Sequence, residues 1–185
     1  MKNEEKESLK INTGATEEQT LTKEEALDFL RLYQPMPKDE NLTTELIDKY
    51  DEVLRFFLQY KTKECIPLFL NSFGQINGFG VYQLVEDVIL QFSMNEVIPY
   101  IKEAIKSNIY SVRYWNVQIA INYPSIEILP TLKDILNEND FDIKYNAIVA
   151  IGQFDKEIYK PILEDYLEKE TEEELIIVAR SFLNE

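Results

Sequence analysis

The 185-residue chain contains no histidine and a single cysteine, and these two gaps exclude several kinds of site. Without histidine there is no Ser-His-Asp or Cys-His catalysis, no His-based zinc site and no imidazole to move protons near pH 7. With one cysteine, an intrachain disulfide and a thiolate zinc or iron–sulfur site are excluded as well. Cys65 lies among apolar residues, which is typical of a small buried side chain and not of a reactive thiol. We therefore expect no cofactor.

Glycine and proline are scarce, with five and seven residues, and no apolar run approaches the roughly 20 residues of a membrane span. Folds built from β-strands need more of both residues in their turns, so this balance favours helices. The first twenty residues contain no apolar segment of the secretory type. A cytoplasmic location is therefore expected.

Positive charge is also in short supply, because 34 acidic residues face 19 basic ones and the formal net charge is −15. A nucleic-acid-binding protein needs a cationic surface to displace counterions, and an anionic membrane would repel this chain. We expect neither of these partners. A basic protein would be attracted and steered by the same charge, so a basic protein partner is expected. The alternative is that the acidity only keeps the protein soluble.

What the sequence does contain is a repeat of 31 or 32 residues, marked by a proline in CIPLFLNSF, VIPYIKEAI, ILPTLKDIL and YKPILEDYL. Between the prolines, SVRYWNVQIAINY (111–123) aligns with DIKYNAIVAIGQF (142–154), and the apolar residues of both have helical spacing. Each unit is therefore predicted to be two helices. A proline in or just past the first helical turn removes at most one hydrogen bond and sets the same entry bend each time. The repeated prolines are Pro67, Pro99, Pro130 and Pro161.

This pattern resembles the HEAT repeat, particularly the short bacterial kind, over roughly residues 65–183. DFDIKYNAIVAIGQF resembles the second-helix signature of that family, in which Val/Ile-Arg/Lys follows an acidic residue and small residues lead to Gly-x-Leu/Phe. The resemblance implies an all-α fold, a right-handed α-α superhelix of about four to five helix pairs. Trp115 and Asn116 depart from the family's small residues, so looser or reshaped stacking is expected there. The resemblance to the HEAT repeat also implies that Arg113 and Lys144 pair with an acidic residue of a neighbouring unit, and Asp142 is a candidate for that residue.

A single domain is expected over residues 21–185, after a disordered acidic tail over residues 1–20. Thr22-Lys23-Glu24-Glu25 fits a capping box for a short helix, and residues 43–60 carry one apolar helical face. These two helices would form a divergent capping pair over residues 21–62, as is usual for a terminal repeat. The repeats proper are expected over residues 63–93, 94–124, 125–155 and 156–185.

The segment FGQINGFG (73–80) holds three of the five glycines. A phosphate-binding loop of the Walker type would follow a strand and would end in lysine and Ser/Thr, and neither condition holds here. We interpret the segment as a structural turn between the two helices of one repeat. A loop that contacts a partner is the alternative.

In helix-pair arrays the second helices line the inner, concave face, which is a surface suited to a partner. Three tyrosines occupy equivalent repeat positions, and tyrosine or tryptophan exposed in such a column suits a protein interface. The alternative is that these rings only fill gaps between repeats. No catalytic or metal-binding residue is expected. The candidate partner-binding residues are Tyr82, Gln83, Glu86, Tyr114, Trp115, Gln118, Tyr145 and Asn146.

The sequence favours a non-catalytic interaction protein that presents an acidic, tyrosine-rich concave surface to a partner protein. An inhibitor or a toxin-immunity protein that shields a basic nuclease is one concrete form. A HEAT-like enzyme of the DNA glycosylase or lyase type is an alternative, because Tyr114 and Trp115 resemble the aromatics of a glycosylase groove, although the net charge opposes such a groove. A second alternative is a nucleic-acid mimic whose carboxylates imitate phosphates.

Overall fold

The computed structural model describes residues 21–75 and 77–184. This part of the chain folds into ten α-helices and three short 3-10 helices without a β-strand, which confirms the predicted all-α class. None of its helices is both long and apolar enough to cross a bilayer. The tail expected over residues 1–20 lies outside the described residues. The α-helices are α1 (Lys23–Leu32), α2 (Thr44–Gln59), α3 (Cys65–Asn71), α4 (Gln83–Ile89), α5 (Met94–Ala104), α6 (Tyr110–Ile119), α7 (Leu129–Ile135), α8 (Phe141–Ile151), α9 (Lys156–Leu167) and α10 (Glu173–Leu183).

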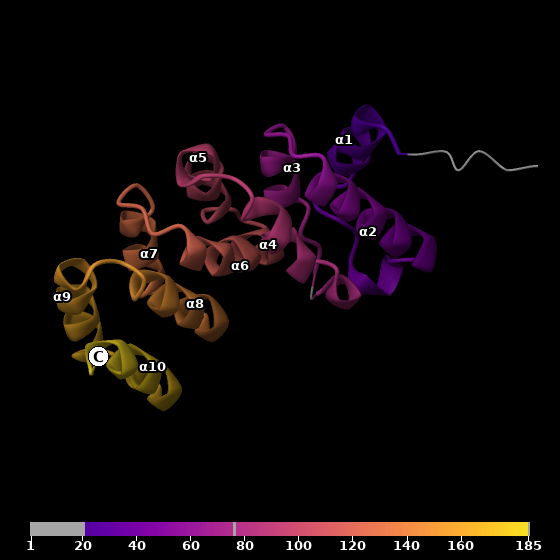
Figure 1. Ribbon diagram of the computed structural model, residues 1–185. Coiled ribbons are helices and arrows are strands. Elements are labelled where there is room, and N and C mark those ends of the chain that lie inside the picture. Colours follow the sequence, from indigo (N-terminus) through magenta and orange to yellow (C-terminus); the bar gives the residue numbers. More distant parts are fainter. Residues whose placement is uncertain (1–20, 76, 185) are drawn as a thin grey trace, which may run out of the picture.

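Successive helices pack against each other as pairs: α1 with α2, α3 with α4, α5 with α6, α7 with α8, and α9 with α10. Neighbouring pairs meet through α1, α3 and α5 on one side, and through α2 with α4, α6 with α8, and α8 with α10 on the other. In Figure 1, α5, α7 and α9 lie along one side of the row and α6, α8 and α10 along the other. Each of the intervals 63–93, 94–124, 125–155 and 156–185 contains one such pair.

Polar side chains fix where several helices begin. The predicted capping box of α1 is confirmed, because the Glu25 carboxylate accepts a hydrogen bond from the Thr22 amide at 2.9 Å and the Thr22 hydroxyl accepts one from the Glu25 amide at 3.3 Å. At the start of α2 the hydroxyl of Thr43 accepts from the Leu46 amide at 3.3 Å. Such caps satisfy amides that have no partner within the helix. The two N-terminal helices therefore lie where the sequence predicts them.

The expectation that every repeated proline lies in or near the first turn is wrong for two of the four. Pro99 and Pro161 are the sixth residues of α5 and α9, well inside each helix. Helix α5 begins early because Ser93 and Glu96 form a capping box, in which the Glu96 carboxylate accepts from the Ser93 amide at 2.8 Å and from its hydroxyl at 2.7 Å. Both proline rings are exposed, so water can bond the carbonyl groups that lose their helical partner.

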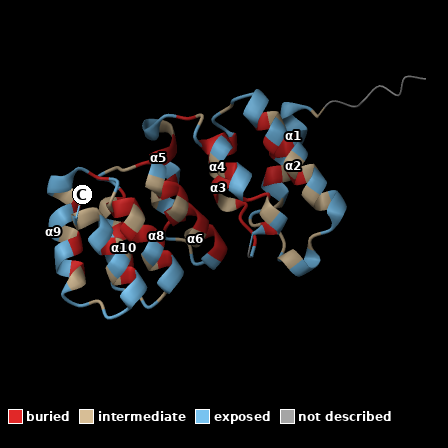
Figure 2. Ribbon diagram, turned by 60° about the horizontal axis from the view of Figure 1, so that its bottom comes forward, coloured by how far each residue is buried: buried red, intermediate tan, exposed pale blue. Residues whose placement is uncertain are grey.

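Buried residues run along the whole row of helices, on the sides that face neighbouring helices (Figure 2). The aromatic part of this core is continuous from α2 to α6. Tyr50 contacts Tyr82 edge-on with ring centres 5.9 Å apart, Tyr82 contacts Phe73 at 5.8 Å, and Phe73 stacks on Trp115 at 5.6 Å. Cys65 is fully buried, as predicted, and burial raises the pKa of its thiol to about 12. A thiol in this state is not a nucleophile at neutral pH.

Helices α3 and α6 are joined by hydrogen bonds between uncharged groups, which we call the neutral join. The Asn116 amide donates to the Leu70 carbonyl at 2.7 Å, and the Ser111 hydroxyl donates to the Phe73 carbonyl at 2.9 Å. These bonds satisfy carbonyl groups at and beyond the end of α3, which have no helical partner. The unusual residues Trp115 and Asn116 therefore reshape the packing by bringing α6 directly against α3. Both side chains are buried at this contact.

Candidate functional site

The eight candidate residues divide into a buried group and a surface group. Tyr82, Trp115 and Asn146 are buried, Glu86, Tyr114 and Gln118 are half-buried, and Gln83 and Tyr145 are exposed. The three equivalent tyrosines therefore do not form a uniformly exposed column. For Tyr82 and Trp115 the structure corrects the expectation of solvent-facing rings, because both side chains belong to the core.

The glycine-rich segment explains why Tyr82 is buried. A Cβ atom on Gly78 would lie 2.7 Å from the Tyr82 ring, and one on Gly74 would lie 2.4 Å from the Tyr82 hydroxyl. Both separations are far below van der Waals contact, so only glycine lets this segment fold so closely over the ring. Gly78 also has φ +55°, a conformation that favours glycine. Gly74 and Gly78 therefore have a structural role, because they let this segment cover the Tyr82 ring.

Three of the candidates, Gln83, Tyr114 and Trp115, line a surface pocket of about 340 Å³. This volume falls at the lower end of the range for small-ligand pockets, roughly 300–1,000 Å³. Of the other lining side chains, the sequence singled out only Asp142, and for a structural ion pair. The candidates Tyr82, Glu86, Gln118, Tyr145 and Asn146 do not line the pocket. We call it the Tyr110 pocket, and its complete lining is Asn77, Gln83, Tyr110, Ser111, Tyr114, Trp115 and Asp142.

An aromatic pair recurs at the beginning of α6 and again at the beginning of α8. Tyr110 stacks on Tyr114 with ring centres 6.2 Å apart and an interplanar angle of 16°, and Phe141 lies 6.4 Å from Tyr145. Residues four apart lie on the same side of a helix, so each pair forms a continuous patch. Tyr110 is 52% exposed and Tyr145 41% exposed. We call these four rings the aromatic face. The four-residue spacing, repeated at an interval of 31, is a signal in the sequence that would have identified Tyr110 and Phe141.

Two carboxylates stand beside the aromatic face. Asp142 lines the Tyr110 pocket, and Asp140 accepts a 3.5 Å hydrogen bond from the Tyr110 hydroxyl. Partial burial, reinforced by the negative charges of Asp140 and Asp142, raises the pKa of Tyr110 to about 12. Within the described residues neither carboxylate forms an ion pair. The pocket therefore carries negative charge without an internal counterion.

The basic residues of α6 and α8 are engaged elsewhere. Arg113 of α6 pairs with Glu138, which follows α7. Lys144 of α8 pairs in the same way with Glu170, which follows α9. We call these two contacts the charged rungs. They correct the expectation that Asp142 is the acidic partner. Asp142 belongs to the first turn of α8 and lines the Tyr110 pocket.

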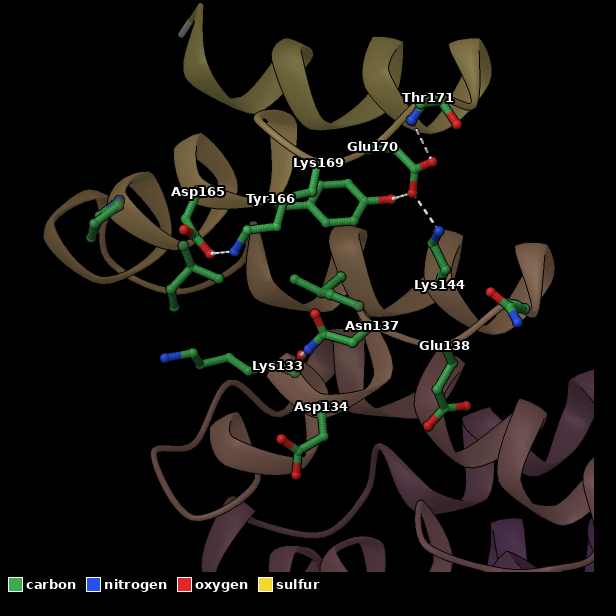
Figure 3. Close-up of a pocket in the computed structure, with 14 residues that line it drawn as sticks. Lys133, Asp134, Asn137, Glu138, Lys144, Asp165, Tyr166, Lys169, Glu170 and Thr171 are labelled. Atoms are coloured by element: carbon green, nitrogen blue, oxygen red, sulfur yellow. Dashed lines mark hydrogen bonds and ion pairs between the residues drawn. The ribbon is translucent and has the colours of Figure 1, made fainter.

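A larger cavity of about 690 Å³ lies between α7, α9 and the turns that follow them (Figure 3). Its charged groups mostly bond one another. Glu170 accepts hydrogen bonds from Lys144 and the Tyr166 hydroxyl, and from the Thr171 amide at 2.8 Å, while Lys169 pairs with Asp165 at 2.9 Å. Burial alone would raise the pKa of Glu170, but these hydrogen bonds outweigh it and hold the pKa at about 2. This arrangement is typical of a structural contact between repeats.

The described residues contain no group of three or more acidic or cysteine side chains arranged to hold a metal ion. The Tyr110 pocket offers flat aromatic surface, hydrogen-bonding side chains and negative charge, which is a combination suited to binding a cation. No protein-family model, curated protein or solved structure matches the chain.

Proposed function

We propose that the protein is a non-catalytic interaction module that holds a basic partner protein through the aromatic face and the Tyr110 pocket. In this proposal the five helix pairs form a HEAT-like, right-handed α-α superhelix, and the second helices present the binding surface. The observation that carries the proposal is that exposed aromatic rings at the beginnings of α6 and α8 lie beside the carboxylates of Asp140 and Asp142, which form no ion pair within the described residues.

Exposed aromatic side chains support a protein interface because they bury a large apolar area at a low cost in side-chain entropy. Tyr110 is 52% exposed and Phe141 37%, and the two residues occupy equivalent positions in two repeats. The net charge of −15 would steer a basic protein toward this surface and raise the rate of association. An inhibitor or immunity protein directed at a basic enzyme is one form that this chemistry fits.

The two alternatives receive less support from the same surface. A glycosylase-type groove needs unpaired cations, whereas Arg113 and Lys144 on the second helices are bonded to carboxylates. A nucleic-acid mimic needs a regular row of carboxylates, whereas aromatic rings occupy the beginnings of α6 and α8. A non-catalytic interaction with a basic protein would use the exposed aromatic rings and the carboxylates beside them.

The proposal is tested by capturing partners from lysate of the native host at low salt, with the purified protein immobilised. The test variant is Tyr110→Ser/Tyr145→Ser. The matched control is Tyr60→Ser/Tyr100→Ser, because Tyr60 is 56% and Tyr100 41% exposed, close to the values of the two test residues. We expect one basic protein in stoichiometric amount with wild type and control, and its loss with the test variant. Equal capture by all three proteins, or no reproducible partner, would contradict the proposal.

A further inference from the structure

We infer that the Tyr110 pocket takes an arginine side chain of the partner. This inference rests on the proposed function and specifies the chemistry of its site. It follows from three features of the described residues: the flat aromatic walls of the pocket, the carboxylate of Asp142 in its lining, and the exposed residue Phe79, which has an unfavourable backbone conformation and whose amide bonds Asn77 of the lining.

The walls of the pocket suit a planar cation. Tyr110 and Tyr114 are nearly parallel, at 16°, and Trp115 meets Tyr114 edge-on at 5.6 Å. Trp115 is in turn stacked on Phe73 of the core, so the pocket wall is held in place from below. A guanidinium stacks on aromatic faces and is weakly hydrated, whereas a lysine ammonium is a compact and strongly hydrated charge. The aromatic walls therefore favour arginine over lysine.

The charge of the pocket completes the match. Asp142 lines the pocket, and Asp140 lies within 3.5 Å of the Tyr110 hydroxyl. A carboxylate can accept two parallel hydrogen bonds from a guanidinium, which adds geometric specificity to the charge attraction. The two cations on α6 and α8 do not compete for these carboxylates, because both belong to the charged rungs. An incoming arginine would supply the missing counterion.

Phe79 provides an independent indication that a ligand binds at this edge. It is a non-glycine residue with φ 55°, yet its ring is 65% exposed, so packing within the protein does not compensate the unfavourable backbone. The Asn77 side chain, which lines the pocket, accepts a hydrogen bond from the Phe79 amide at 3.0 Å and helps to hold this conformation. Strain of this kind is often retained at binding sites. We assign Phe79 to the rim of the pocket, beside Asn77.

The test uses the purified full chain and three capped tripeptides, acetyl-Gly-X-Gly-amide with X as arginine, citrulline or lysine. Citrulline keeps the shape of arginine without its charge. Trp115 is the only tryptophan of the chain and lines the pocket, so its fluorescence reports occupancy. We expect a saturable change in Trp115 fluorescence with the arginine peptide. The citrulline and lysine peptides should bind about tenfold more weakly, because citrulline loses the charge-assisted hydrogen bonds and lysine loses the stacking contact.

Substitutions test whether the arginine peptide binds at the Tyr110 pocket. Asp142→Asn should weaken binding of the arginine peptide by about fivefold or more, whereas Asp48→Asn, the same exposed change on α2, should leave it within about twofold. Phe79→Gly should weaken binding while the protein becomes no less stable, because glycine adopts this backbone without strain. A lower stability of Phe79→Gly together with unchanged binding would overturn the role of the rim.

The outcomes separate this inference from the proposed function. If the partner is captured through the aromatic face but the arginine peptide gives no saturable response, or citrulline or lysine binds equally well, the arginine assignment is wrong and the proposed function stands. If the arginine peptide binds as expected but no basic protein is captured, the pocket assignment holds and the proposed function fails. An Asp48→Asn effect as large as that of Asp142→Asn would show attraction to overall charge and overturn the inference.

Discussion

The neutral join between α3 and α6 and the charged rungs between the later repeats hold helix pairs together by different chemistry. At the neutral join, the side chains of Asn116 and Ser111 donate to backbone carbonyls inside an aromatic core. In the rung of Lys144 with Glu170, two charges meet with only 12% and 8% of their side chains exposed. Both contacts lie between adjacent repeats. The same repeat interval therefore does not require the same chemistry at each join.

The neutral join and the charged rungs contribute differently to the proposed binding surface. Ser111 and Trp115 belong both to the packing against α3 and to the lining of the Tyr110 pocket, so the neutral join supports the pocket from the core side. The charged rungs engage Arg113 and Lys144, so neither cation forms an ion pair with the carboxylates beside the aromatic face. One type of join supports the wall of the site, and the other leaves its negative charge without a counterion from α6 or α8.

The largest effect is expected from breaking the buried rung. Lys144→Met leaves the Glu170 carboxylate buried without its cation, and should lower the free energy of unfolding by about 3 kcal/mol. Urea denaturation measures the loss. Lys160→Met is the control, because the Lys160–Glu164 pair is exposed on α9 and contributes little. Equal losses in the two variants would mean that the rung is not a structural contact.

Breaking the neutral join should cost somewhat less. Asn116→Ala removes the buried donor to the Leu70 and Val112 carbonyls, both at 2.7 Å, and we expect a loss of about 2 kcal/mol. Because no charge is involved, the loss should be the same at low and high salt. Asn122→Ala is the matched control, since its bond to Glu86 is exposed. A loss that changes strongly with salt would contradict the distinction between the two joins.

The pH dependence sharpens the comparison. The pKa of Glu170 is about 2 in the folded protein and 4.5 ordinarily, so its stabilising effect is complete above pH 4.5 and is lost as pH falls toward 2. Glu170→Gln should therefore be less stable than wild type at pH 7, by about 2 kcal/mol, and the two should converge near pH 2. The stability loss of Asn116→Ala should stay constant over this range. A constant gap between Glu170→Gln and wild type would contradict the charged rung.

The smallest of these effects is expected from the more exposed rung. Arg113→Met removes a pair with Glu138 whose side chains are 23% and 36% exposed, and also a 3.2 Å bond to the Ile105 carbonyl. We expect a loss of about 1 kcal/mol, reduced further by salt. A loss as large as that of Lys144→Met would mean that burial does not set the strength of the rungs.

The sequence predicts well the features that repeat and the one helix start with a recognised capping box. Helical spacing and the proline interval predict the all-α class, and the capping residue Thr22 predicts the start of α1. The register of Pro99 was missed, because Ser93 and Glu96 form a cap that starts α5 a turn earlier than expected. Helix α9 begins without a side-chain cap, so no such local signal marks its start ahead of Pro161.

For the candidate site, periodicity predicted three of the pocket residues, Gln83, Tyr114 and Trp115. It also placed Tyr82 on the surface, because equivalent repeat positions were taken to be equally exposed. Tyr82 is buried by glycines that only its own repeat contains, and no pattern in the other repeats predicts that contact. The sequence analysis assigned Asp142 to a structural ion pair with the basic ladder. The true partner of Lys144 is Glu170, which is distant in the sequence and carries no local signal of this contact.

The most direct test of the proposed surface is the free energy of unfolding of Tyr110→Ser/Tyr145→Ser, measured in urea beside Tyr82→Ser. If the exposed rings serve binding, the double variant should lie within about 1 kcal/mol of wild type, whereas Tyr82→Ser should lose about 3 kcal/mol or more from the core. A loss in the double variant comparable to that of Tyr82→Ser would show that the aromatic face fills gaps between repeats, and would contradict its assignment as a binding surface.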